Sequence, residues 1–256
     1  MRSPILILAA LALNVPARAQ ILETETARQL PRGQIELGAG YEFQHSKDGN
    51  EIAIPIAFEL GVTNRLGLLI EPVPYTAIRP ESGTSATGLG DLEITMSYLL
   101  RRESPRFPAL AFAAEEKLPT ARNNLIGTGK ADHTAYLIAS KMLGRFDNHL
   151  NIGYTVVGSP KGQSLQNRVS AALASELAVT ATTLLYGEVL GSTSAGGGEG
   201  DTGGTTNPVP EASGDEILGT LGIAHSFGRG TRFSFGVTRD NVGAMQIRPG
   251  VTLWFR

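Results

Sequence analysis

Residues 51–62 read EIAIPIAFELGV, a stretch in which large apolar side chains alternate one by one with small or acidic ones. The large apolar set is Ile52, Ile54, Ile56, Phe58, Leu60 and Val62, and the opposite set is Glu51, Ala53, Pro55, Ala57, Glu59 and Gly61. Successive side chains of a β-strand point to opposite faces, so this stretch predicts a strand with one apolar and one polar face. A strand of about ten residues exceeds the five or six usual in soluble sheets and matches the length that crosses a lipid bilayer at a tilt.

The same pattern continues through the chain. From 34 to 255 the sequence divides into about twelve runs of roughly ten residues, and the gaps between them alternate, with one exception, between short and long. Short gaps lie at 61–65, 102–106 and 178–181, and long gaps at 77–88, 119–131 and 192–214. We therefore predict an all-β fold: a closed transmembrane antiparallel β-barrel of about 12 strands, an up-and-down meander with both ends at the short-turn rim. The facing of the runs at 132–142, 182–191 and 215–227 is ambiguous.

The first nineteen residues predict a secretory signal. Arg2 supplies the positive start, residues 5–13 the apolar stretch, and Ala17-Arg18-Ala19 the cleavage site. We therefore divide the chain into a signal peptide at 1–19 and an outer-membrane β-barrel at 20–256. The expected location is the bacterial outer membrane, with the membrane lipid and the outer-membrane assembly machinery as partners.

Composition excludes several classes of protein. The chain has no cysteine, which removes disulfides and the lipid-attachment residue of a bacterial lipoprotein. It carries 22 basic and 24 acidic residues without a clustered basic face, so nucleic acid is not expected as a partner. The competing fold is a soluble sandwich or lipocalin-like barrel, whose strands also alternate. The length of the runs and the ending Leu253-Trp254-Phe255 favour the membrane barrel.

The polar face of a membrane barrel surrounds the lumen, because a charge in lipid costs about 2–4 kcal/mol for Arg or Lys and less for a carboxylate. A filled, salt-bridged interior and a path for solute explain such a lumen equally well. Ten residues are candidates for the lumen and the solute path: Glu42, Glu59, Glu71, Asp91, Glu93, Glu115, Lys117, Asp132, Arg168 and Glu176.

Motifs for covalent or metal chemistry are weak. Residues 127–130 (GTGK) lack the upstream glycine and the following Ser or Thr of a phosphate loop, and the calcium-like glycine motif at 197–201 occurs once. None of the four histidines has metal-ligand spacing. Asp132 and His133, at the outer rim, are the one candidate catalytic pair. We assign no catalytic residue, cofactor or metal.

Short motifs point to a family. Residues 87–94 read TGLGDLEI, 117–120 read KLPT, 127–132 read GTGKAD and 61–66 read GVTNRL. They resemble the outer-membrane family of meta-pathway phenol degradation proteins, with Ala121 where that family favours glycine. We expect glycines such as Gly88, Gly90, Gly127 and Gly129 to adopt positive φ where loops re-enter strands.

The resemblance implies a porin-like transporter of small, often aromatic compounds. We therefore expect a passive outer-membrane channel for small molecules, phenol-type compounds among them, and not an enzyme. The alternatives are a barrel enzyme with a rim active site acting on lipid or peptide, and a structural barrel with a filled lumen.

Overall fold

The computed structural model describes residues 22–196, 215–228 and 230–255. The predicted signal peptide and the glycine motif at 197–201 lie outside these residues. In this part of the chain there is no helix with the length and hydropathy needed to span a membrane.

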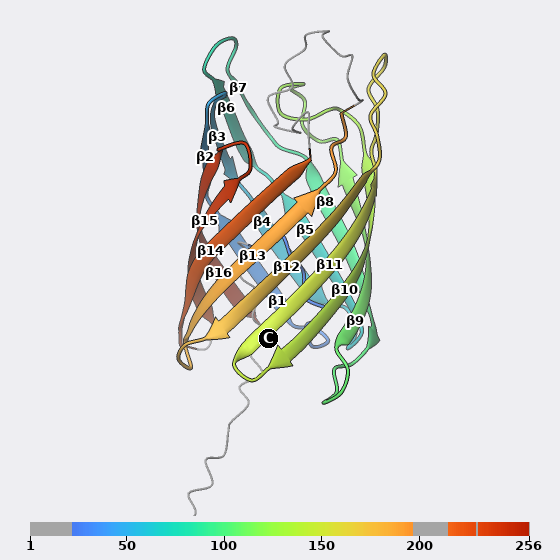
Figure 1. Cartoon of the computed structure of the whole chain (residues 1–256), viewed down its shortest axis with the longest axis vertical. Helices are drawn as coiled ribbons and strands as arrows, with labels where there is room; N and C mark the ends of the chain where they lie inside the picture. Colours follow the sequence, from blue (N-terminus) through green and yellow to red (C-terminus); the bar gives the residue numbers. More distant parts are fainter. Residues whose placement is uncertain (1–21, 197–214, 229, 256) are drawn as a thin grey trace, which may run out of the picture.

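The described chain forms one closed antiparallel β-barrel (Figure 1). The first four barrel strands are each split into two segments: β1 (Ile35–Gly40) and β2 (Glu42–Ser46), β3 (Gly49–Ile54) and β4 (Ile56–Gly61), β5 (Leu66–Pro72) and β6 (Tyr75–Pro80), and β7 (Ala86–Gly88) and β8 (Leu92–Arg101). The other eight are continuous: β9 (Ala109–Leu118), β10 (Asp132–Leu143), β11 (Phe146–Val156), β12 (Arg168–Ala178), β13 (Thr183–Ser192), β14 (Glu216–Phe227), β15 (Thr231–Asp240) and β16 (Met245–Phe255). Neighbours in sequence pair with one another, and β1 pairs with β16 to close the ring. The predicted twelve-stranded closed barrel is confirmed.

The two rims differ as predicted. The turns at 62–65, 102–108, 144–145 and 179–182, with the end of β14 and the start of β15, form one rim, which we call the short-turn rim. The connections at 81–85, 119–131, 157–167 and 241–244, the tight turn at 47–48, the end of β13 and the start of β14 form the long-loop rim, drawn uppermost in Figure 1. Ile35 pairs with Phe255, so β1 begins and β16 ends at the short-turn rim.

One predicted loop is wrong. Residues 77–88 are mostly strand, because β6 and β7 pair here, with Ile78 opposite Ala86, and only 81–85 connect them. Both side chains are buried in a small apolar cluster with Ala121 and Ile126 from the loop at 119–131. That contact supports strand pairing in a stretch whose Pro, Ser and Gly content indicates a loop.

In the barrel wall, apolar side chains are exposed and polar side chains are buried, which is the reverse of a soluble protein. On β14, which had ambiguous facing, Leu221 is 73% exposed while its neighbour Thr220 is 1% exposed. The same contrast holds on β13 between Val189 outside and Glu188 inside, and on β10 between Leu137 outside and Ile138 inside. Large apolar side chains therefore cover the exterior, as a barrel that faces lipid requires, and the soluble alternative is excluded.

Candidate functional site

The N-terminal segment, which we define as residues 22–34, lies inside the barrel. The Thr24 amide donates to Glu188 Oε2 on β13 (3.0 Å), and the Ala27 amide donates to Ser140 Oγ on β10 (2.8 Å). At its end the Gly33 amide donates to the carbonyl of Gly61 (2.7 Å), at the short-turn rim. The segment therefore enters the lumen from the short-turn rim, a position that the sequence analysis did not predict.

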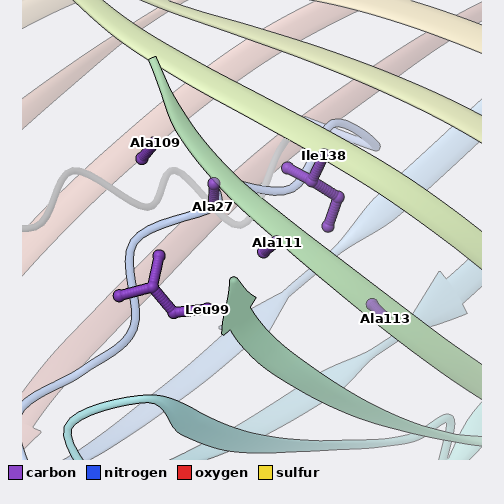
Figure 2. Close-up of a cluster of buried hydrophobic side chains, with 6 residues drawn as sticks. All are labelled: Ala27, Leu99, Ala109, Ala111, Ala113 and Ile138. Carbon is purple, nitrogen blue, oxygen red and sulfur yellow. The ribbon is translucent and has the colours of Figure 1, made fainter. Parts of the chain in front are cut away.

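Small side chains on the wall make room for the segment. Figure 2 shows Ala27 among buried side chains of three neighbouring strands: Leu99 on β8, Ala109, Ala111 and Ala113 on β9, and Ile138 on β10. Both Ala27 and Ala111 are 0% exposed. Because alanine projects only one methyl group from the wall, a chain can lie against β9 here and fill the lumen.

An ion-pair clamp holds the segment at the short-turn rim. The Arg28 guanidinium donates to both oxygens of Asp147 on β11 (2.9 and 2.7 Å) and to Glu103 in the turn at 102–108 (2.6 Å). Burial alone would lower the pKa of Arg28, but its bonds to Glu103 and Asp147 outweigh burial and raise it. Burial would likewise raise the pKa of Glu103, yet its bonds to Arg28 and to the Met142 amide bring it below 4.5.

Above the segment the lumen is hollow. Two cavities of about 400 and 460 Å³ adjoin and share lining residues such as Glu93, Glu115 and Arg168. Leu22, Glu23 and Glu25 line the lower cavity from the N-terminal segment, and residues 126–128 of the loop at 119–131 line the upper one. The hollow therefore lies between the N-terminal segment and the long-loop rim.

The ten residues predicted to face the lumen do so, at different depths. Seven line the upper cavity: Glu42, Asp91, Glu93, Glu115, Lys117, Asp132 and Arg168. Glu71 lines the lower cavity together with Glu93 and Glu115. Glu59 and Glu176 are not part of the hollow; they are buried nearer the short-turn rim, at the level of the N-terminal segment. Whether any of the ten contacts a solute remains a prediction.

Two of these carboxylates hold the loops at the long-loop rim. Asp132 pairs with Lys117 Nζ (2.5 Å) and accepts a hydrogen bond from the Gly158 amide (2.8 Å). Asp91 accepts a hydrogen bond from the Ala121 amide (2.9 Å). Asp91 and Asp132 therefore fix the wall of the hollow as well as its charge.

The expectation of positive φ at the motif glycines holds for Gly129 (φ 68°) and is wrong for Gly88, Gly90 and Gly127. Space explains two of these three. A Cβ on Gly127 would lie 2.8 Å from Ala121 Cβ and 2.8 Å from Asp91 Oδ2, and one on Gly90 would lie 2.8 Å from Val73 Cβ. Close approach of backbone to side chain, rather than dihedral freedom, requires glycine at these two positions.

Several lumen residues escaped the sequence analysis. Glu51 was on the polar face of the opening stretch, Glu216 begins a strand of ambiguous facing, and Asp240 ends β15. Glu23 and Glu25 precede the first strand, where no alternation exists to predict a face. With them, eleven carboxylates line the two cavities: Glu23, Glu25, Glu42, Glu51, Glu71, Asp91, Glu93, Glu115, Asp132, Glu216 and Asp240. The basic side chains that line them are Lys117, Arg168 and Arg248.

The candidate pair Asp132 and His133, to which we assigned no catalytic role, does not form a dyad in the structure. Asp132 and His133 are neighbours on β10, so their side chains point to opposite faces of the wall. Asp132 faces the lumen and binds Lys117, whereas His133 is exposed on the outer face, where its Nδ1 lies 2.5 Å from Glu116 Oε2. No Asp-His dyad can form from these two residues.

A second constellation has the residue types of a nucleophilic triad. Ser140 Oγ lies 2.9 Å from His149 Nδ1, and His149 Nε2 lies 3.8 Å from Asp147 Oδ2. A nucleophile needs access to substrate. Ser140 is 0% exposed, its oxygen accepts the Ala27 amide, and Arg28 occupies Asp147. These three side chains therefore anchor the N-terminal segment rather than form an accessible active site.

Metal chemistry has no geometric support in the described residues, which contain no group of three or more His, Cys, Asp or Glu arranged to hold a metal ion. The carboxylates of the hollow are spread along its wall on several strands.

The barrel, its apolar exterior and its polar lumen define the class of outer-membrane-type β-barrels. No protein-family model and no curated protein sequence matches this chain, so the resemblance to the phenol degradation family remains an expectation.

Solved structures match its fold. The COG4313 outer membrane channel from Pseudomonas putida F1 is 15% identical, with a TM-score of 0.66 over 91% of this chain and 100% of that chain. The KdgM porin in complex with disordered oligogalacturonate is 11% identical, with a TM-score of 0.57 over 86% of this chain and 99% of that chain. The NanC porin is 9% identical, with a TM-score of 0.58 over 85% and 98%. At these identities the likeness concerns the fold alone.

Proposed function

We propose that the protein is a passive channel for small molecules in the bacterial outer membrane. The observation that carries the proposal is the hollow of adjoining 400 and 460 Å³ cavities between the N-terminal segment and the long-loop rim. A barrel wall with an apolar outside supports the location in lipid. The short-turn rim then faces the periplasm and the long-loop rim faces outward, as in bacterial single-chain barrels.

The N-terminal segment sets the conducting state. Its contacts with the wall include hydrogen bonds, the ion pairs of Arg28 and Glu23, and apolar contacts of Leu22 and Ala27, none of which is a strand pair of the barrel. The segment can therefore shift without breaking a strand pair. Passage therefore requires a path beside the segment or its displacement. The filled short-turn end also favours one alternative, a structural barrel that does not conduct.

Phenol-type solutes are the finer part of the proposal and rest on the family resemblance. Tyr136 is the one aromatic side chain among the described residues that line the two cavities, so the wall offers little stacking surface. A solute panel decides this point: phenol, glucose and a small diamine should enter liposomes that contain the protein faster than empty liposomes. Rates equal to those of empty liposomes for the whole panel would favour the structural barrel.

The location has its own test. The chain lacks cysteine, so single cysteines can be introduced cleanly. Ser164→Cys, in the loop at 157–167, should react with an impermeant thiol reagent on intact cells, and Thr63→Cys, in a short turn, should not. Reversed labelling would overturn the orientation, and recovery of the unmodified chain in the soluble periplasm would overturn the membrane location.

A further inference from the structure

Acidic side chains outnumber basic side chains in the hollow. Eleven carboxylates and three basic side chains of the described residues line the two cavities. A lumen lined by one sign of charge concentrates solutes of the opposite sign and repels those of the same sign.

The basic side chains of the hollow are already engaged. Lys117 is paired with Asp132 (2.5 Å), and Arg248 is paired with Glu23 (2.5 Å) and Glu42 (3.2 Å). Arg168 likewise has an interaction of its own. These three basic side chains are shared among eleven carboxylates, so the acidic side chains of the hollow remain in excess.

Three carboxylates of the hollow, Glu51, Glu71 and Glu93, have no hydrogen bond or ion pair to a residue of the described part of the chain. Glu71 and Glu93 lie directly opposite each other in the register of β5 and β8, a placement that is unfavourable for like charges. Within the described part of the chain neither side chain has a hydrogen bond or an ion pair. Lys117 is opposite Glu93 on its other side, in β9, but its ammonium group is bound to Asp132. A positive solute would supply the missing counter-charge.

The neighbours of this pair suit an ammonium group. Glu115 and Glu25 line the same cavity, and so does Tyr136, whose hydroxyl lies 3.5 Å from Glu115 Oε1. Carboxylates bind ammonium groups through charge-assisted hydrogen bonds, and an aromatic ring attracts a cation to its face. The absence of a metal-binding arrangement in the described residues, and a cavity of about 460 Å³, favour an organic cation over a metal ion.

We propose that the hollow selects small organic cations carrying one or two ammonium groups, and that Glu71 and Glu93 are its selectivity residues. This inference rests on the proposed channel function and names the solute class of that channel.

The test is a reversal-potential measurement in planar bilayers across a KCl gradient, with putrescine as the organic probe. The full-length channel should pass K⁺ in preference to Cl⁻, and putrescine should block the K⁺ current. In Glu71→Gln/Glu93→Gln the K⁺/Cl⁻ permeability ratio should fall roughly threefold, as expected for the loss of two partly screened charges, and the block by putrescine should weaken. The gel shift between unheated and boiled samples verifies that each variant forms a barrel.

The matched control is Glu116→Gln, which makes the same charge change on β9 but on the outer face, next to Glu115. It should leave the permeability ratio unchanged. Equal K⁺ and Cl⁻ permeability in the unmodified channel, or an equal effect of the control, would overturn the cation selectivity while leaving the channel intact. The complete absence of current would overturn the channel function and the selectivity with it.

Discussion

The two ends of β9 show how one strand builds two different parts of the lumen. From the short-turn rim upward its inner face presents Ala109, Ala111 and Ala113, and then Glu115 and Lys117. The alanine end is covered by the N-terminal segment, while the charged end lines the hollow. Both ends obey the same alternation of inner and outer side chains. Alternation therefore decides which side chains face inward, and their size and charge decide whether the lumen is filled or open.

The physical basis of this difference is the space that each inward side chain occupies. Alanine leaves room for a second layer of backbone, and Ser140 and Asp147 supply partners for the Ala27 amide and the Arg28 guanidinium. At the other end, long charged side chains face one another across the lumen, where each needs water or a counter-charge. Close association with an apolar chain segment would remove that hydration.

Removal of the N-terminal segment should have the largest effect. We expect protein refolded without residues 22–32 to form the barrel and to conduct several-fold more current per channel, because the filled end becomes open. Single-channel recording measures this directly. An unchanged conductance would mean that the segment does not limit passage.

Ala111→Phe should reproduce part of that effect without a deletion. The new ring would have to enter space that Ala27 occupies, and such overpacking costs about 1–3 kcal/mol unless the segment moves away. We expect higher conductance and protease cleavage within residues 22–34. The control is Ala114→Phe on the exposed outer face of the same strand, which should change neither readout. Equal cleavage in both variants would contradict the contact between the segment and β9.

Acid should loosen the clamp at the short-turn rim. The pKa of Glu103 is lowered by Arg28, so its stabilisation of the folded state is present above the ordinary value of 4.5 and is lost as the pH falls through the lower folded value. The pKa of Arg28 is raised, so the guanidinium stays charged throughout. At a pH low enough to protonate Glu103, labelling of Ala27→Cys should therefore rise relative to labelling of Thr63→Cys at the same pH, a comparison that cancels the smaller thiolate fraction in acid.

With Glu103→Gln on the same background, the labelling ratio to Thr63→Cys at pH 7 should already match the ratio that the parent reaches in acid. Glu81→Gln, which removes an exposed carboxylate from the turn at 81–85, serves as the control and should keep the dependence on pH. If Glu103→Gln retained the full dependence on pH, the clamp would not be its source.

Lys117→Gln should have the smallest effect on the barrel and acts at the hollow end. Asp132 would keep the hydrogen bond from the Gly158 amide but lose its ion pair with Lys117. The loss of one partner of a buried charge should lower the free energy of unfolding by about 1–3 kcal/mol. We expect a modestly lower Tm and a higher K⁺/Cl⁻ permeability ratio, because one positive charge leaves the lumen. A ratio that falls instead would argue against selectivity by lumen charge.

The strands and the inner face could be predicted because both depend on local rules. Glu59 and Phe58, like Glu93 and Ile94, point to opposite faces because successive side chains of an extended chain alternate, which needs no distant contact. The cost of a charge in lipid then assigns the polar face to the lumen. The same rule removes Asp132 and His133 as a candidate catalytic pair, since neighbours on one strand do not share a face.

The remaining features depend on residues that are far apart in the sequence. Ala27 meets Ser140 across 113 positions and Arg28 meets Asp147 across 119, and no periodicity links such pairs. The strand pairing of β6 with β7 likewise relies on contacts of Ile78 and Ala86 with the loop at 119–131. These contacts form only once the barrel has brought its strands around a common axis.

By itself, therefore, the sequence determined a twelve-stranded barrel, its short-turn and long-loop rims and an inner face rich in carboxylates. The reason is that the alternation of side chains and the composition of turns depend only on residues close together in the sequence. The tertiary structure alone decided that residues 22–34 fill one end of the lumen, that the other end is hollow, and that Lys117 and Arg248 are engaged while Glu71 and Glu93 are not. The reason is that filling and charge compensation are properties of the enclosed space, which exists only after β1 pairs with β16 and closes the barrel.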